Sequence, residues 1–401
     1  MSVLKETACF FLSISLTFRA KQHVIRAAAA SSIKFREHMN KRHQTRRVMV
    51  GRIAIGGDAP VAVQSMTNTK TTDIDATMNQ IERLEQAGCD IIRLAVPNKA
   101  AVPAFAEIKK HANAPLVADI HFDYHLALGA LDAGADKIRI NPGNIGEHWK
   151  VEQVVKKAVS YNVPIRVGVN SGSIEKDILQ QEGGPTVAAL VSSALRNVDI
   201  CRQFGATELV LSLKSSSVVH TIEAYRLAAL QTDVPLHIGV TEAGTVRSGT
   251  IKSAVGLGVL LAEGIGDTLR VSLTGDPVEE VYVGLQILKD LELIPAGVTF
   301  ISCPTCGRTN VDMIPIAEEV ERRLASVSTN ITVAVMGCVV NGPGEAREAD
   351  IGVACGRGSA TLIKKGEIVR KIPEDQIIDE LVNEVLDLDK ARLQKNDNED
   401  S

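Results

Sequence analysis

The feature that most restricts how this chain can fold is a repeated alternation of short β-branched runs with helix-like segments. The runs are almost continuously apolar, and they span residues 61–67, 91–96, 115–120, 137–142, 164–170, 208–216, 235–243 and 268–274. Strands of this kind are parallel and buried on both faces. Eight β–α units in about 230 residues predict an α/β fold of the (β/α)₈ barrel type, which usually has about 250 residues. A doubly wound open sheet is the structural alternative.

The pattern changes on both sides of this region. The stretch "VMVGRIAIGGDAP" (48–60) reads as a hairpin with a Gly-Gly-Asp turn that plugs the bottom of the barrel. The alternation stops after "LELIPAG" (291–297), which marks a linker. Further strand-like and helix-like runs then predict a smaller α/β domain. We expect the barrel over 48–292, the second domain over 298–390 and a polar tail over 391–401.

The first 47 residues differ from the rest in charge. They carry a local net charge of +8, whereas the whole chain carries −4. Such an extension is typical of a transit peptide, or it results from a start codon misassigned upstream of Met39. We therefore leave this basic extension, expected to be disordered, out of the fold prediction. No run of 18 apolar residues predicts a membrane span, and the acidic remainder with 3% aromatic residues argues against nucleic-acid binding.

Polar side chains gather at the carboxyl ends of the predicted strands, where barrel enzymes hold their active sites. Cations stand at five of these ends, namely Arg93, Arg139, Arg166, Lys214 and Arg270. The planar guanidinium fork suits phosphate oxygens. The sequence therefore predicts a ring of positive charge that binds a small, multiply anionic and phosphorylated substrate. Other polar residues at these ends include Asp119, His121, Asn170, His237, Glu242 and Ser272.

Three cysteines mark the second domain. Cys303 and Cys306 form a Cys-x-x-Cys pair in "ISCPTCGRT", and Cys338 follows in "MGCVVNGPGEA". Zinc knuckles usually come as two pairs, whereas an iron–sulfur cluster accepts isolated further ligands. The spacing therefore favours iron–sulfur over zinc, a redox dithiol or inert thiols. For the fourth ligand, Cys355 is the obvious candidate by chemistry, and Glu345 is the less obvious one.

Long motifs show a family resemblance. They are "VQSMTNT", "VADIHFDY", "RINPGNIG", "RVGVNSGSIEKD", "HIGVTEAG", "GIGDTLRVSL", "CPTCGRT" and "GCVVNGPGEA". Over residues 47–385 the chain resembles the 4-hydroxy-3-methylbut-2-enyl diphosphate synthases of isoprenoid biosynthesis. The resemblance implies a (β/α)₈ barrel followed by a domain that binds a [4Fe–4S] cluster. It also implies that Cys303, Cys306, Cys338 and Glu345 are the cluster ligands, which leaves Cys355 as a bystander.

The resemblance further implies a reaction. The family opens the ring of 2-C-methyl-D-erythritol 2,4-cyclodiphosphate and removes a hydroxyl reductively, using two electrons from flavodoxin or ferredoxin. Glu242 would be the catalytic proton donor or stabiliser. The predicted substrate contacts are Arg93, Asp119, Arg139, Arg166, Asn170, Lys214, Arg270 and Ser272. The resemblance also implies a cytoplasmic, head-to-tail homodimer, in which each cluster caps the partner's barrel. The alternatives from other classes are a non-catalytic iron–sulfur redox sensor and a zinc-stapled nucleic-acid module.

Overall fold

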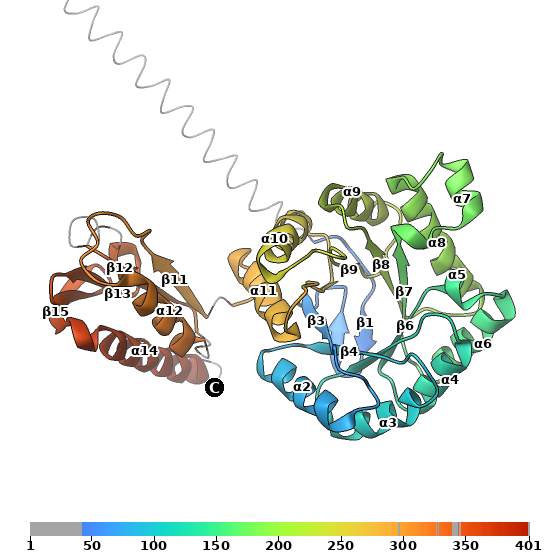
Figure 1. Cartoon of the computed structure of the whole chain (residues 1–401), viewed down its shortest axis with the longest axis horizontal. Coiled ribbons are helices and arrows are strands. Elements are labelled where there is room, and N and C mark those ends of the chain that lie inside the picture. Colours follow the sequence, from blue (N-terminus) through green and yellow to red (C-terminus); the bar gives the residue numbers. More distant parts are fainter. Residues whose placement is uncertain are drawn as a thin grey trace, which may run out of the picture. The chain divides into compact units, whose positions relative to one another are not determined.

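A computed structural model describes residues 42–399, except 296, 326, 328, 339–343 and 345, and it leaves the side chains of 171 and 396–399 undescribed. The chain divides into two compact units at residues 291 and 292, and each is described by itself (Figure 1). No helix among the described residues is long and apolar enough to cross a membrane.

The first unit is a closed barrel of parallel strands. The sheet has eight strands in the order β8-β7-β6-β5-β4-β3-β10-β9. A parallel bridge between Leu211 and Leu236 joins β8 to the residue before β9, which closes the circle. Each predicted run contains one strand, so the barrel is confirmed over the open sheet. The strands are β3 Ala62–Met66, β4 Ile91–Ala95, β5 Leu116–Asp119, β6 Lys137–Ile140, β7 Ile165–Asn170, β8 Leu209–Lys214, β9 His237–Ile238 and β10 Thr268–Leu269.

Helices surround the barrel (Figure 1). Several begin at residues whose side chains accept backbone N–H groups, as Asp73 does before α2 and Asp276 does before α11. The helices are α2 Ile74–Gln86, α3 Ala101–His111, α4 Tyr124–Asp132, α5 Pro142–Ile145, α6 His148–Ser160, α7 Lys176–Gln181, α8 Val187–Gln203, α9 Val218–Ala229, α10 Val246–Ala262 and α11 Pro277–Asp290, with the 3₁₀ turn η1 Ser171–Ser173.

A hairpin plugs the bottom of the barrel. β1 (Val48–Val50) and β2 (Ile53–Ile55) pair antiparallel, and the inner side chains of the hairpin pack against Ala62, Ile91, Val117 and Val210 of the barrel strands. The predicted Gly-Gly-Asp turn is wrong, because the chain reverses at Gly51 and Arg52, where Gly51 has φ +54°. Residues 42–47, assigned to the basic extension, also contact the barrel, since Thr45 Oγ1 donates to Asp267 at 2.9 Å.

The second unit is a five-stranded mixed sheet, and two long helices pack against it in the described part of the chain. Strands β11 (Val298–Ser302), β12 (Ile331–Met336) and β13 (Ile351–Gly356) run parallel, and β14 (Ser359–Lys364) and β15 (Glu367–Pro373) extend the sheet antiparallel. Helices α12 (Met313–Leu324) and α14 (Ile377–Glu399) share an apolar core with the sheet. The short turns are η2 (Ala346–Glu348) and η3 (Glu374–Gln376). Because α14 runs to Glu399, the segment predicted as a tail begins as helix.

Candidate functional site

The inward side chains of the barrel strands fall into layers of four taken from alternate strands. These layers follow from the pairing register, with the shift of about eight residues per circuit that is usual for this fold. Counted upward from the hairpin plug, the first layer is Ala62, Pro115, Pro164 and Pro235, and the second is Ile91, Lys137, Val210 and Thr268. The third layer is Gln64, Val117, Arg166 and His237, and the fourth is Arg93, Arg139, Ser212 and Arg270. The fifth layer is Met66, Asp119, Gly168 and Gly239, and the sixth, at the mouth, is Ala95, Asn141, Lys214 and Ser272.

These layers bring the five predicted cations together inside the barrel. Arg93, Arg139, Arg166 and Lys214 are each less than 9% exposed, and Arg270 is largely buried. The carboxylates bonded to these cations are Asp119, which pairs with Arg139, and Glu280, which pairs with Arg270. Within the described part of the chain, the other three cations form no ion pair. The interior therefore carries an excess of positive charge that suits a multiply charged anion.

On one side of the barrel mouth, the Asp119 carboxylate contacts two other polar side chains. It accepts a hydrogen bond from Arg139 Nη1 at 3.3 Å, and His121 Nε2 lies 3.3 Å from its other oxygen. Burial alone raises the pKa of Asp119, but the charges of Arg93, Arg139 and Arg166 and the bond from His121 hold it well below its usual range. Asp119 is thus an ionised group that fixes Arg139 while leaving part of its guanidinium free.

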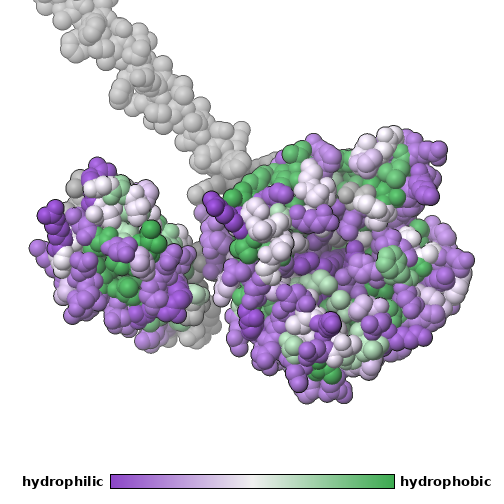
Figure 2. All heavy atoms as spheres, viewed as in Figure 1, coloured by the Kyte–Doolittle hydropathy of each residue, from purple (hydrophilic) through white to green (hydrophobic). Residues whose placement is uncertain are grey.

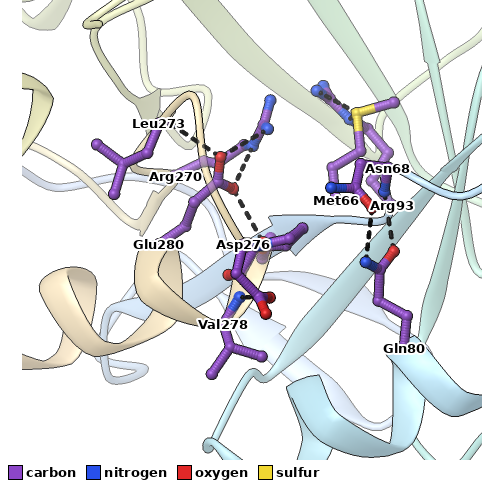
Figure 3. Close-up of polar contacts among 11 residues, drawn as sticks. Met66, Asn68, Gln80, Arg93, Arg270, Leu273, Asp276, Val278 and Glu280 are labelled. Atoms are coloured by element: carbon purple, nitrogen blue, oxygen red, sulfur yellow. Dashed lines mark hydrogen bonds and ion pairs between the residues drawn. The ribbon is translucent and has the colours of Figure 1, made fainter. Parts of the chain in front are cut away.

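A second clamp holds Arg270 on the other side (Figure 3). Glu280 reaches in from α11 and accepts two hydrogen bonds from Arg270, each at 3.2 Å. It also accepts from Ser65 Oγ at 2.9 Å and from the backbone N–H of Leu273 at 3.0 Å. Because four donors converge on this buried carboxylate, the direction of the Arg270 side chain is fixed before any ligand arrives.

Among the described residues, the hydrogen-bond partner of Arg93 is a sulfur atom. Its Nε and Nη2 donate to the sulfur of Met66 at 3.1 and 3.0 Å (Figure 3). Burial lowers the pKa of Arg93 to about 10. Burial also lowers the pKa of Arg166 and of Lys214 well below the ordinary values, and neighbouring arginines act in the same direction. An anion in contact with these groups would offset the free-energy cost of burying their positive charges, so the site favours the binding of an anion.

Two glycines make room for the cations. A Cβ at residue 168 would lie 2.7 Å from Arg139 Nε, and a Cβ at residue 239 would lie 2.8 Å from Lys214 Nζ. Heavy atoms do not approach so closely without displacement. Glycine at residue 168 leaves room for the Arg139 side chain, whereas at residue 239 it is needed mainly because the backbone oxygen of Arg270 would lie 2.6 Å from a Cβ.

The remaining predicted barrel residues lie at the rim. Asn170 is exposed at the end of β7, and Ser272 is partly exposed after β10. Glu242 is exposed in the turn after β9, where its φ of +52° is unusual for a residue with a side chain. The described residues offer it no hydrogen bond or ion pair. Glu242 is thus a free carboxylate held in a strained turn, a combination found at functional sites.

The predicted thiol ligands lie at the carboxyl ends of two paired strands. Cys303 follows β11, and its sulfur accepts a hydrogen bond from the N–H of Gly337 at 3.1 Å. Cys338 follows β12 and is buried. Cys306 is exposed, and the N–H of Arg308 lowers the pKa of its thiol, with the Arg308 charge adding to the effect. An N–H donor to one sulfur and an acidified second thiol fit thiolate ligation of a metal cluster.

The two candidates for the fourth ligand are Glu345 and Cys355. Glu345 lies outside the described residues. Cys355 is fully buried in the apolar core, and burial raises the pKa of its thiol to about 12. Within the described ranges, no three His, Cys, Asp or Glu side chains are close enough together to hold a metal ion.

Three residues that lie among the cations or contact them were not among the predicted site residues. Lys137 lies in the same run as Arg139 and two residues before it, so period-two alternation already places both on one face. His237 stands at a strand end, but its depth could not be read from the sequence. Glu280 lies on a helix, and no sequence signal connects it to Arg270.

Known proteins resemble this chain along almost all of the described length. A family model described as the GcpE TIM-barrel domain matches residues 45–285, and one described as the GcpE protein C-terminal domain matches 299–387. A protein of Geobacter sulfurreducens is 59% identical over 342 residues, covering 85% of this chain and 97% of that protein. One of Clostridium perfringens is 58% identical over 341 residues, covering 85% and 98%. Both are named 4-hydroxy-3-methylbut-2-en-1-yl diphosphate synthase (flavodoxin).

Among solved structures, the dihydropteroate synthase of Stenotrophomonas maltophilia has a TM-score of 0.47 at 15% identity, and the match covers 63% of this chain and all of that protein.

Proposed function

Because this chain belongs to the GcpE family, we propose that its cationic barrel interior binds the diphosphate of the family's substrate. The chain is a 4-hydroxy-3-methylbut-2-en-1-yl diphosphate synthase, an oxidoreductase of isoprenoid biosynthesis. It converts 2-C-methyl-D-erythritol 2,4-cyclodiphosphate, two electrons and two protons into the linear hydroxymethylbutenyl diphosphate and water. We prefer this enzymatic function to that of a non-catalytic redox sensor. The structural observation that supports it is the excess of buried cations in the barrel.

Each predicted substrate contact has a physical role in this proposal. Arg139 and Arg270, fixed by Asp119 and Glu280, present preset forks to phosphate oxygens. Among the described residues, no carboxylate forms an ion pair with Arg93, Arg166 or Lys214. A bound anion therefore does not compete with a carboxylate for their positive charge. Asn170 and Ser272 stand at the rim and would meet the hydroxyl-bearing part of the substrate. Because the arginines are held in place, little ordering cost remains when the ligand binds.

Glu242 is the proposed proton donor. It is exposed after β9 and free of partners among the described side chains, so its carboxyl group can turn toward a substrate oxygen. Loss of a hydroxyl group as water needs one proton at that oxygen. Glu242, placed beside the substrate, would supply it, and Glu242→Gln would remove this proton source while keeping the shape.

We propose a [4Fe–4S] cluster as the electron carrier, held by Cys303, Cys306, Cys338 and Glu345. When bound, such a cluster would supply the two electrons of the carbon–oxygen reduction one at a time. The Gly337 N–H on the Cys303 sulfur and the acidified thiol of Cys306 support this ligation. A carboxylate as fourth ligand is harder and more exchangeable than a thiolate. Cys355 is not part of the set, because its buried thiol serves the core.

The partners follow from the same reading. Flavodoxin is the proposed electron donor, since the relatives' names include it, and the protein would work in the reducing cytoplasm. We also propose a head-to-tail homodimer in which the partner's cluster domain completes each barrel. An apolar face supports a second copy as occupant: five exposed large hydrophobic side chains lie on the neighbouring helices α9, α10 and α11, namely Val219, Val246, Ile251, Val255 and Tyr282. Figure 2 shows apolar surface over this part of the barrel.

Anaerobic turnover tests the function. The reconstituted protein, given the cyclic diphosphate and a chemical reductant, should form the linear diphosphate. About four irons per chain are expected, and stoichiometric zinc would refute the cluster. Glu345→Ala should lower the iron content more than Cys355→Ala, and the reverse ranking would show that the fourth ligand is Cys355.

Two experiments test the homodimer. Ile251→Glu with Val255→Glu should turn a dimer into a monomer by light scattering, while Val159→Glu on α6, another exposed apolar residue, should leave it dimeric. Mixing Cys306→Ala with Glu242→Ala chains should restore part of the activity through mixed dimers. No recovery in verified mixed dimers would rule out a site shared between subunits.

A further inference from the structure

Beneath the layer formed by Arg93, Arg139, Ser212 and Arg270 lies a set of buried polar atoms that have no hydrogen-bond partner among the described residues. The atoms are Lys137 Nζ, Arg166 Nε and Nη1, His237 Nε2 and both amide atoms of Gln64. Their side chains belong to two successive layers of the barrel, and none of the four residues is more than 1% exposed. Unpaired polar groups at this depth are rare in native proteins, because each one loses its bonds to water.

The charges around these atoms are mostly positive, and the Asp119 carboxylate acts on Arg166 among them. Burial lowers the pKa of Lys137 well below its ordinary value, and Arg166 and Arg93 lower it further. Burial also lowers the pKa of the His237 imidazole, and the same two arginines, together with Lys214 and Lys137, lower it further. Neither layer contains a carboxylate. Asp119, two layers above Arg166, is bound to Arg139 and His121. Because Arg166 cannot lose its proton and shares the charge of Asp119 with Arg93 and Arg139, the positive charge at this depth is not balanced by a carboxylate of its own.

The balance of donors and acceptors indicates which ligand would fit. Thr268 Oγ1 lies 3.4 Å from His237 Nδ1, so its hydroxyl can donate there and leave Nε2 as an N–H donor. Lys137, Arg166 and the Gln64 amide nitrogen are donors as well, and the Gln64 oxygen is the one acceptor among the unpartnered atoms named above. A water molecule could accept hydrogen bonds from these donors, but it also has two hydrogens to donate, and the unpartnered atoms offer too few acceptors for them. A ligand that only accepts, and that carries negative charge, satisfies both conditions.

We propose that the barrel holds a small inorganic monoanion such as chloride between Lys137, Arg166 and His237, beneath the substrate and bound independently of it. The anion keeps the Lys137 ammonium charged and supplies the acceptor that the layer lacks. It also supports Arg166 from below, so that the guanidinium can face the diphosphate above. The inference goes beyond the proposed function, since neither the cluster nor turnover is needed for this binding.

Halide binding to the reconstituted protein tests the proposal. Thermal unfolding should occur at a higher temperature in sodium chloride or bromide than in sodium gluconate of equal ionic strength. At a halide concentration ten times the Kd, the expected rise is about 3–5 °C. Lys137→Met should lose the rise, while Lys176→Met, an exposed lysine on α7, should keep it. A wild-type protein with equal unfolding temperatures in all three salts would overturn the proposal.

Crystals grown in bromide provide a second measurement that needs no variant. An anomalous peak within hydrogen-bonding distance of Lys137 Nζ is expected, and its absence at high bromide would refute the site. Inorganic pyrophosphate separates the two possible sources of anion. If the halide effect and the peak persist with saturating pyrophosphate, the deep site is independent. If pyrophosphate abolishes both, the site is merely the lower end of the phosphate seat and the proposal is wrong. Catalytic failure would alter none of these outcomes.

Discussion

Replacing Glu280 by glutamine tests whether the Arg270 clamp is built as the structure indicates. The carboxylate is 4% exposed and receives two hydrogen bonds from Arg270, one from Ser65 and one from the Leu273 backbone. Glutamine keeps the shape and one acceptor oxygen, but it removes the charge and points an amide N–H₂ at groups that are themselves donors. Breaking a buried ion pair by removing one partner costs about 3–5 kcal/mol. Because Arg270 retains some exposure, we expect about 3 kcal/mol.

Urea unfolding provides the assay. The chain has a single tryptophan, Trp149 on α6, so its fluorescence reports on the barrel unit alone. With a slope of about 2–3 kcal/mol per molar urea, the midpoint should fall by about 1–1.5 M. The double variant Arg270→Met with Glu280→Gln should regain about 2 kcal/mol over Glu280→Gln, because it no longer buries an unpaired cation. A double variant as unstable as the sum of its single variants would refute the reasoning.

Kinetics separate positioning from mere stability. Glu280 does not touch the substrate in this account but aims Arg270 at it. Glu280→Gln should therefore raise KM about tenfold, which corresponds to about 1.4 kcal/mol of uniform binding, while kcat changes little. A fall in kcat at unchanged KM would show that Arg270 is not a binding group.

Three further predictions concern other parts of the molecule. Gly168→Ala should weaken binding of the cyclic diphosphate about tenfold by calorimetry, because the new Cβ displaces Arg139; unchanged affinity would contradict the predicted contact. Burial and neighbouring cations lower the pKa of His237 in the folded protein. Below pH about 6.5 the unfolded chain therefore binds one proton more than the folded protein. As the pH decreases further, this group lowers the free energy of unfolding by about 1.4 kcal/mol per pH unit. Urea midpoints at pH 7.5 and 5.5 should accordingly differ less in His237→Gln than in the wild type, and equal differences would exclude this role. In cluster-free protein, iodoacetamide followed by mass mapping should modify the exposed Cys306 before Cys355, whose buried thiol has a pKa of about 12; early labelling of Cys355 would show that it is accessible.

Much of the fold could be read from local patterns. The alternation of apolar runs located all eight barrel strands, including β9 and β10, which are only two residues long. The turn of the plug hairpin was misplaced, because several glycines lie close together there and composition alone does not say which one reverses the chain. Strands β14 and β15 were not predicted, since exposed polar residues obscure the apolar alternation on an edge strand such as β15.

The candidate site divides in a similar way. Arg93, Arg139, Arg166, Lys214 and Arg270 were found because strand ends converge in a barrel whatever its details. Their depth and pairing could not be found, because these depend on which residues face one another across strands far apart in the chain. The ligand role of Glu345 stays a prediction, since that residue lies outside the described structure.

The sequence by itself determined the order of strands, which side chains of each strand face inward, and the family to which the chain belongs. These properties follow from short-range periodicity and from motifs that need no partner to be recognised. Only the tertiary structure decided that Arg270 is held by Glu280 from a helix, and that Lys137, Arg166 and His237 lie in two barrel layers that contain no carboxylate. The register between distant strands stacks the inward residues into layers, and this stacking sets the burial, and therefore the electrostatic cost, of each charge.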